Sequence, residues 1–105
     1  MSITKRYLKS KPICKTKFTI SSSEAGDAEK AFLSGDFNGW DISSLPMQKL
    51  KNGDFTITID LDCGREYHFK YLMDGIKWQN DPDADDYRPS PYLDSDNCIV
   101  IIDRS

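Results

Sequence analysis

The chain has 105 residues and a formal net charge of -3. Its length suits one modest core and falls well short of the roughly 250 residues of a (β/α)₈ hydrolase barrel. The negative net charge disfavours a nucleic acid partner, because proteins bind its phosphates mainly through Lys and Arg. No apolar run approaches the ~20 residues that cross a bilayer and no signal-peptide pattern follows Met1, so we expect a cytoplasmic protein without a membrane partner.

The two ends of the chain differ in charge. Lysine and arginine dominate residues 1–17, before the first acid, Glu24, whereas the last quarter is rich in aspartate. We expect residues 1–12 to form a solvated basic arm leading into an edge strand, and residues 13–105 to form the single domain. Opposite charges at the two ends also favour attraction between them.

Alternating side chains predict the first strands. In residues 14–20 one side carries Cys14, Thr16, Phe18 and Ile20, and residues 31–34 form a short apolar run of strand length. The strongest signal is at residues 55–61, where apolar and polar side chains alternate without a break and most are β-branched or aromatic. We therefore expect half-buried strands in all three segments.

The second half of the chain continues the pattern. Residues 67–73 place Tyr67, Phe69 and Tyr71 on the core face, so His68 and Lys70 point the other way. Asp74-Gly75 predicts a hairpin turn with positive φ at both central positions, and residues 98–102 form a last apolar strand. Short strands, frequent turns and no helical period predict an all-β, antiparallel immunoglobulin-like β-sandwich.

Both tryptophans follow turns and have polar neighbours. Trp40 comes after Asn38-Gly39, and Trp78 lies between Lys77 and Gln79. This setting favours exposure of the indoles, and a flat ring with nearby hydrogen-bonding groups suits the apolar face and hydroxyl rim of a sugar. The residues alone leave a sugar platform and a partly buried structural tryptophan equally open.

The order of these motifs resembles a known family. The run of residues 33–40, with sequence LSGDFNGW, is followed by Pro46-Met47, the run GREYHFKY at 64–71, Asp74-Gly75, Trp78, Asp81-Pro82 and Asn97. This looks like a family 48 carbohydrate-binding module, the family of the glycogen-binding domain in the AMP-activated protein kinase beta subunit and of the domains that precede the barrel in isoamylases and branching enzymes. The resemblance covers about residues 30–102 and implies an early-set immunoglobulin-like sandwich.

The resemblance also implies a ligand site and its occupant. It assigns stacking on glucose rings to Trp40 and Trp78, hydrogen bonding to Lys70 and Asn97, and loop contacts to Leu93 and Ser95. The implied partners are α-1,4-linked glucan chains such as glycogen, starch or maltooligosaccharides. The family often has glycine where this chain has Asp94, which implies a different loop shape around Leu93 and Ser95.

Catalytic and metal sites have weaker support. Asp81, Asp83 and Asp85 have the spacing that opens a calcium loop, but the glycine and glutamate that complete such a loop are missing, so a structural turn is favoured. His68 has no motif partner, and three separated cysteines indicate neither a disulfide framework nor a zinc site.

We therefore expect a noncatalytic α-glucan binder without cofactor or metal. One alternative is a protein-interaction module that docks onto a glucan-metabolising enzyme or a kinase. The other is a stand-alone relative of the N-terminal domain of a family 13 glycoside hydrolase. Exposure of both indoles on one face favours glucan binding, whereas burial of either favours the interaction module.

Overall fold

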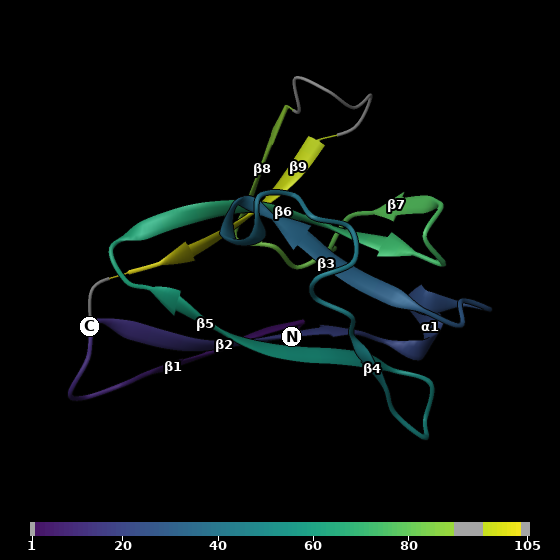
Figure 1. Ribbon diagram of the computed structural model, residues 1–105, viewed down its shortest axis with the longest axis horizontal. Helices are drawn as coiled ribbons and strands as arrows, with labels where there is room; N and C mark the ends of the chain where they lie inside the picture. Colours follow the sequence, from purple (N-terminus) through teal and green to yellow (C-terminus); the bar gives the residue numbers. More distant parts are fainter. Residues whose placement is uncertain (1, 90–95, 104–105) are drawn as a thin grey trace.

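The computed structural model describes residues 2–89 and 96–103, which form two layers of antiparallel strands (Figure 1). The elements in chain order are β1 (Ile3–Tyr7), β2 (Ile13–Ile20), α1 (Ser22–Ala25), β3 (Ala31–Gly35), the 3₁₀ turn η1 (Asp36–Asn38), β4 (Gln48–Lys49), β5 (Phe55–Asp62), β6 (Arg65–Met73), β7 (Lys77–Gln79), β8 (Asp86–Pro89) and β9 (Asp96–Ile102). Sheet A has the order β1-β2-β5-β4, and sheet B has the order β3-β6-β9-β8, with β7 also paired to β6. The predicted all-β sandwich is confirmed.

The core lies between the two sheets and is built from alternate residues of the strands. On β2 the predicted inward set is buried, and the Phe18 ring meets the edge of Phe69 from β6 at 5.1 Å between centroids. Phe69 in turn contacts Tyr71 at 5.7 Å. Because successive strand residues point to opposite faces, the burial of Tyr67, Phe69, Tyr71 and Met73 turns the residues between them away from the core.

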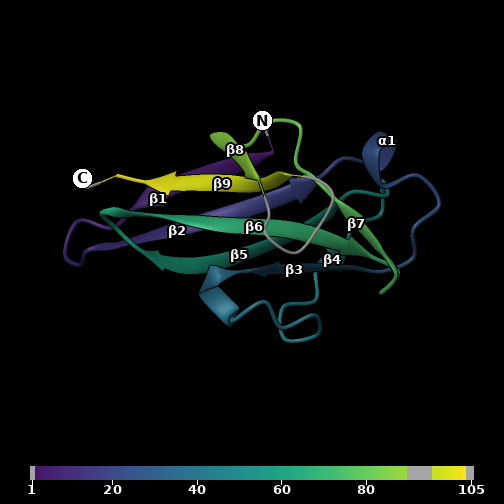
Figure 2. The same cartoon turned by 90° about the horizontal axis from the view of Figure 1, so that it is seen from above.

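Strand β6 occupies the middle of sheet B (Figure 2). It pairs with β3 along residues 69–73 and with β9 along residues 65–69. Its residues 71–73 also pair with β7, so β7 lies on the same edge of β6 as β9. Position 70 falls between the two ladders on that edge.

The turn between β6 and β7 has the predicted chemistry. Asp74 and Gly75 have φ values of 53° and 72°, as the Asp-Gly signal requires. The Asp74 carboxylate accepts hydrogen bonds from the backbone N–H groups of Glu29 and Lys30, at 2.8 and 3.0 Å. These two bonds lower the pKa of Asp74, and the bond from the Lys30 N–H has the larger effect. The turn therefore also fixes the chain that enters β3.

The first residues of the chain belong to the sandwich. Strand β1, within the basic segment 1–12, pairs with β2 at the edge of sheet A. Lys5 Nζ lies 2.7 Å from Asp85 Oδ2, an ion pair between the basic start and the acidic last quarter. Ser2 donates to the buried carboxylate of Asp81, which also accepts from the Tyr71 hydroxyl at 2.7 Å. Asp81 and Asp85 thus have structural roles.

Neither the helix α1 nor the turn η1, the helical elements of the described ranges, is long and apolar enough to span a membrane.

Gly35 gives the first testable prediction. A Cβ at this position would overlap the backbone oxygen of His68 and come within 2.9 Å of the Phe69 Cβ, so the backbone must shift. We expect Gly35→Ala to lower the free energy of unfolding by about 3 kcal/mol. Gly39→Ala is the matched control: its Cβ meets no atom within 4 Å, and its φ of 65° alone costs about 1 kcal/mol. Urea unfolding of both variants measures the difference, and equal effects would contradict the close approach at Gly35.

Candidate functional site

The outer face of sheet B carries the side chains that β6 turns away from the core. His68, Lys70 and Leu72 alternate with the core aromatics and therefore share this face. Leu72 and Ile99 are buried, at 3% and 0% exposure, yet neither is part of the core cluster between the sheets. The outer face therefore has buried apolar positions of its own, one opposite His68 and one opposite Trp78.

A cross-strand row places Trp78 on this face. Phe32 of β3 lies opposite Leu72 of β6, and Leu72 lies opposite Trp78 of β7. Directly opposed residues of antiparallel strands point to the same side, so the indole lies beside Leu72. The row continues on the other side of Phe32, which forms an isolated β-bridge with Pro46. Trp78 is half-buried at the end of this apolar row.

Lys70 lies at the junction between β7 and β9. Its ammonium donates to the side-chain oxygen of Asn80, directly after β7, and to the backbone oxygen of Asp96, at the start of β9, at 2.8 Å. The residue is 1% exposed, and this burial lowers the pKa of Lys70, although the charges of Cys98 and Asp96 oppose the shift. Lys70 therefore joins two segments that flank position 70.

Two buried polar atoms next to Lys70 have no hydrogen-bond partner among the described residues. One is Ser34 Oγ, on the β3 residue directly opposite Lys70, and the other is Asn97 Oδ1 on β9. The Asn97 amide nitrogen lies 3.3 Å from His68 Nδ1, so only the nitrogen end of this amide is engaged. Buried polar atoms are normally satisfied, so each of these two has an unused capacity to accept a hydrogen bond.

The loop after β3 is held in place by the residues of the motif at 35–40. Asn38 Oδ1 accepts from the Gly35 N–H at 3.0 Å, while Asn38 Nδ2 donates to Ser44 Oγ at 3.0 Å and to the Asp41 backbone oxygen at 3.1 Å. The Phe37 ring lies 6.1 Å from the ring of Phe18 and so anchors the turn to the core. Local bonds of this kind make the loop a defined structure.

Trp40 is oriented by Asp36. Its indole Nε1 donates to Asp36 Oδ1 at 3.1 Å, and the other oxygen of the same carboxylate accepts from the backbone N–H of His68 at 2.8 Å. Asp36 thus links the indole to the edge of β6 where the pairing with β3 ends. Trp40 has a φ of 61°, which is unusual for a bulky residue, and its N–H donates to the Gly35 oxygen at 2.9 Å. Strained residues of this kind occur most often at functional sites.

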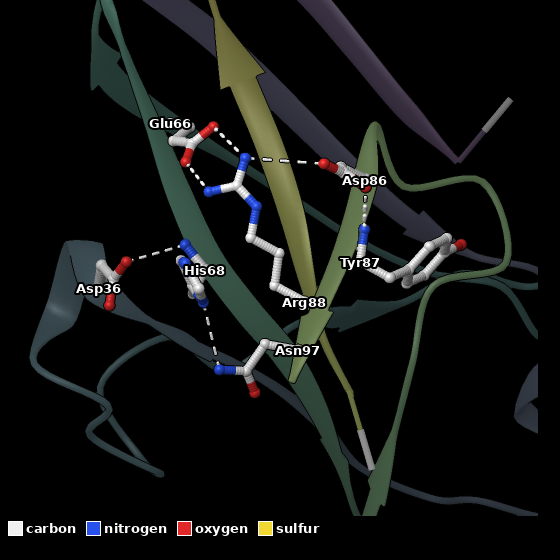
Figure 3. A network of polar contacts seen from close by, with 7 residues as sticks. All are labelled: Asp36, Glu66, His68, Asp86, Tyr87, Arg88 and Asn97. Carbon is white, nitrogen blue, oxygen red and sulfur yellow. Dashed lines mark hydrogen bonds and ion pairs between the residues drawn. The ribbon is translucent and has the colours of Figure 1, made fainter. Parts of the chain in front are cut away.

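An ionic cluster borders the outer face on the side of β8. Arg88 reaches across β9 to make two contacts with Glu66 of β6 and lies 3.6 Å from Asp86 (Figure 3). The same view places His68 between Asp36 and Asn97. Its ring contacts Asn97, while its backbone contacts Asp36. The cluster therefore adjoins His68 and Asn97.

The structure brings together three of the residues that the resemblance assigns to the ligand. Lys70, Asn97 and Trp78 lie on adjacent strands of sheet B, and Trp40 is connected to β6 through Asp36. Both indoles are half-buried, which fits neither full exposure nor burial, whereas Lys70 and Asn97 are buried. The loop residues Leu93 and Ser95 lie outside the described residues.

Comparison with known families identifies the chain. Residues 18–90 match the family described as the glycogen recognition site of AMP-activated protein kinase. The chain belongs to this family. The expected resemblance is confirmed. The family is a noncatalytic carbohydrate-binding one, and glycogen or glucan binding in general follows from the match. A comparison with curated proteins found no match.

Several residues of this glycogen recognition domain were missed in the sequence. In the sequence Asp36 is only one residue of the run LSGDFNGW, although an acid four residues before a tryptophan can reach the indole N–H across a tight turn. Ser34 gave no signal, because its position opposite Lys70 depends on the register of β3 and β6. His68 was placed on the correct face, but its contact with Asn97 depends on the distant strand β9.

The link through Asp36 can be tested by Asp36→Ala. The change leaves the backbone N–H of His68 and the indole N–H of Trp40 without their acceptor. We expect the free energy of unfolding to fall by about 1–2 kcal/mol. We also expect the fluorescence emission of Trp40 to shift to longer wavelength and to become less polarised. A Trp78→Phe background isolates the Trp40 signal. Asp27→Ala, which removes an exposed aspartate, is the control. Unchanged emission in Asp36→Ala would show that the carboxylate does not hold the indole.

Burial of Lys70 predicts a pH dependence of stability. The pKa of Lys70 is lower in the folded chain than in the unfolded chain. At a pH between these two pKa values the unfolded chain binds more protons than the folded chain. The free energy of unfolding should therefore rise with pH over this alkaline range. We expect the stability of the unmodified protein relative to Lys70→Met to increase from pH 8 to pH 10. Urea unfolding across this range measures it, with the exposed Lys17→Met as the control. A difference that stays constant or falls would contradict the depressed pKa.

Proposed function

We propose that this domain binds α-1,4-linked glucan chains on the outer face of sheet B, without catalysis, and tethers its carrier to glycogen or starch-like polymers in the cytoplasm. Trp40 and Trp78 stack on glucose rings, and Lys70 and Asn97 hydrogen-bond to the sugar hydroxyls. Leu93 and Ser95 add contacts from the adjoining loop. The proposal combines the family of the chain with the positions of Trp40, Trp78, Lys70 and Asn97.

The observation that carries the proposal is the polar centre beside Trp78. Lys70, Ser34 and Asn97 are grouped around β6, and the last two each have a buried oxygen without a partner among the described residues. The apolar row that ends in Trp78 lies two residues farther along β6. An aromatic surface next to donors and acceptors matches the C–H face and hydroxyl rim of a glucose ring.

An open surface of this kind favours weak binding. The Trp78 side of the site is a strand face, so a chain lying on it stays largely in solvent. We therefore expect dissociation constants between about 1 μM and 1 mM, with adjacent glucose units contributing together. Avidity from several chain ends on one polymer would strengthen attachment.

A calorimetric titration with maltoheptaose tests the proposal. We expect saturable binding, and a loss of at least about tenfold in affinity for both Trp40→Ala and Trp78→Ala because each removes a stacking surface. Ile76→Ala removes an apolar side chain that is 85% exposed two residues before Trp78, and should bind like the unmodified protein. Cellohexaose, with β linkages, should not bind.

The opposite result would favour the interaction module. The control for folding is a circular dichroism spectrum typical of a β-sandwich. If the folded protein released or absorbed no heat with several millimolar maltoheptaose, the proposal that this chain binds glucans would be wrong. If Trp78→Ala and Ile76→Ala bound maltoheptaose with equal affinity, the stacking role proposed for Trp78 would be wrong, but glucan binding by the chain would not be contradicted.

A further inference from the structure

Strand β1 leaves one edge of sheet A open. It is the first strand in the sheet order β1-β2-β5-β4, and its register with β2 is unbroken from Ile3 to Tyr7. Among residues 2–89 and 96–103, no strand pairs with the other side of β1. An open edge of this kind can accept an extended peptide as an additional strand.

The hydrogen bonds at the two ends of β1 show which of its backbone groups face this edge. The backbone oxygen of Ser2 accepts from β2 at 2.7 Å, and the backbone N–H of Leu8 donates to β2 at 3.0 Å. Bonded positions recur at every second residue of an antiparallel pair, so the even-numbered residues of β1 bond to β2. The backbone groups that point to the open edge are therefore those of the odd-numbered residues, Ile3, Lys5 and Tyr7.

The outer face of sheet A is cationic beside the open edge. Arg6 of β1 lies opposite Lys15 of β2, and Lys17 lies two residues farther along β2 on the same face. Lys15 is 3.3 Å from Asp60, whereas neither Arg6 nor Lys17 has an ion pair with any of the described residues. Two cations on this face are therefore available to an anionic partner.

The inner side of the same edge has different chemistry. Ile3 and Lys5 lie opposite buried residues of β2 and so point to the core side of the sheet. A pocket lies beside β1 here, lined by Ile3, Thr4, Lys5, Asp83 and Asp85. The Lys5 ammonium is already matched by Asp85 at 2.7 Å. The pocket therefore suits a small apolar side chain, and its two carboxylates disfavour an acidic one.

We propose that the open edge of β1 binds an extended segment of an acidic partner protein, which joins sheet A as an antiparallel strand. Its residues opposite Thr4 and Arg6 carry acidic side chains on the cationic outer face. Its residues opposite Ile3 and Lys5 carry small apolar side chains on the pocket side, and their backbone groups bond to β1. The surface belongs to sheet A, so this proposal does not depend on the glucan site proposed on sheet B.

The charge of the edge favours an acidic strand over a second copy of this chain. Residues 1–17 contain six lysines and arginines and neither aspartate nor glutamate. A second β1 would bring the same cations to the same face, and like charges oppose edge-to-edge pairing. A strand that carries carboxylates is attracted instead. β1 has neither a proline nor a break in its register, the backbone features that often prevent strand addition.

Amide hydrogen exchange followed by nuclear magnetic resonance tests the open edge. In the free protein we expect the N–H groups of Lys5 and Tyr7 to exchange at least about tenfold faster than those of Thr4 and Arg6. The probe is a blocked peptide of alternating glutamate and valine residues, which should slow the exchange of Lys5 and Tyr7. Exchange at these two positions that stays unchanged with saturating peptide would overturn the proposal.

Two N-methylated forms of the peptide separate strand addition from general charge attraction. In the proposed antiparallel strand the valine N–H groups bond to β1, and the glutamate N–H groups point away from it. Methylation of the valine nitrogens should therefore abolish measurable binding, whereas methylation of the glutamate nitrogens should preserve it. Equal affinities of the two methylated peptides, or the reverse order, would contradict the proposed strand.

Arg6→Glu tests the role of charge. The change replaces a like-charged neighbour of Lys15 by an opposite charge, so the fold should be retained. We expect the glutamate-valine peptide to bind about three- to tenfold more weakly. Lys51→Glu makes the same change of charge at an exposed position between β4 and β5 and should bind like the unmodified protein. Equal losses in both variants would show that net charge alone attracts the peptide.

Two further measurements distinguish the other outcomes. Analytical ultracentrifugation that shows a dimer, unchanged by the acidic peptide, would assign the open edge to a second copy and overturn the proposal. Arg6→Glu should keep the affinity of the unmodified protein for maltoheptaose. Failure of the peptide to bind would leave the proposed glucan function intact, and failure of maltoheptaose to bind would leave the acidic partner of β1 intact.

Discussion

Strand β6 is hydrogen-bonded along both of its edges, to β3 on one side and to β9 and β7 on the other. This pairing fixes its orientation, so its side chains must alternate between the core and the outer face. The aromatic residues Tyr67, Phe69 and Tyr71 anchor one face of the strand. The position of His68 and Lys70 on the other face is a direct consequence of that packing.

Burial of Lys70 shows how the outer face acquires polar character without full exposure. An isolated ammonium is costly to bury, but oxygens of Asn80 and Asp96 receive two of its hydrogen bonds. The same residues hold the end of β7 next to the start of β9. The group proposed to bind ligand therefore also helps to assemble the surface on which the ligand would lie.

Much of this fold could be predicted because its signals are local. Alternation in residues 14–20 and 67–73 identified the buried faces, and Asp74-Gly75 gave both the turn and its positive φ values. The attraction between the two ends of the chain was also foreseen, and Lys5 with Asp85 realises it. These features depend on neighbours in sequence or on net charge alone.

The polar contacts of the site could not be predicted because they join distant segments. The face of Lys70 followed from alternation, but its burial depends on Asn80 and Asp96, which only the topology brings to position 70. The half-buried state of both tryptophans likewise depends on the loop after β3 and on the row opposite Leu72. A pattern of residue types specifies which face a side chain takes, but not what covers it.

The clamp on Trp40 has a consequence for the thermodynamics of recognition. Its indole is held by Asp36 and its backbone by the Gly35 oxygen, so the ring has little rotational freedom left to lose when a ligand arrives. Ordering a mobile side chain at an interface costs roughly 0.5–1.5 kcal/mol. In this chain that entropy is lost when the domain folds, so the sugar contact proposed for Trp40 would be correspondingly more favourable.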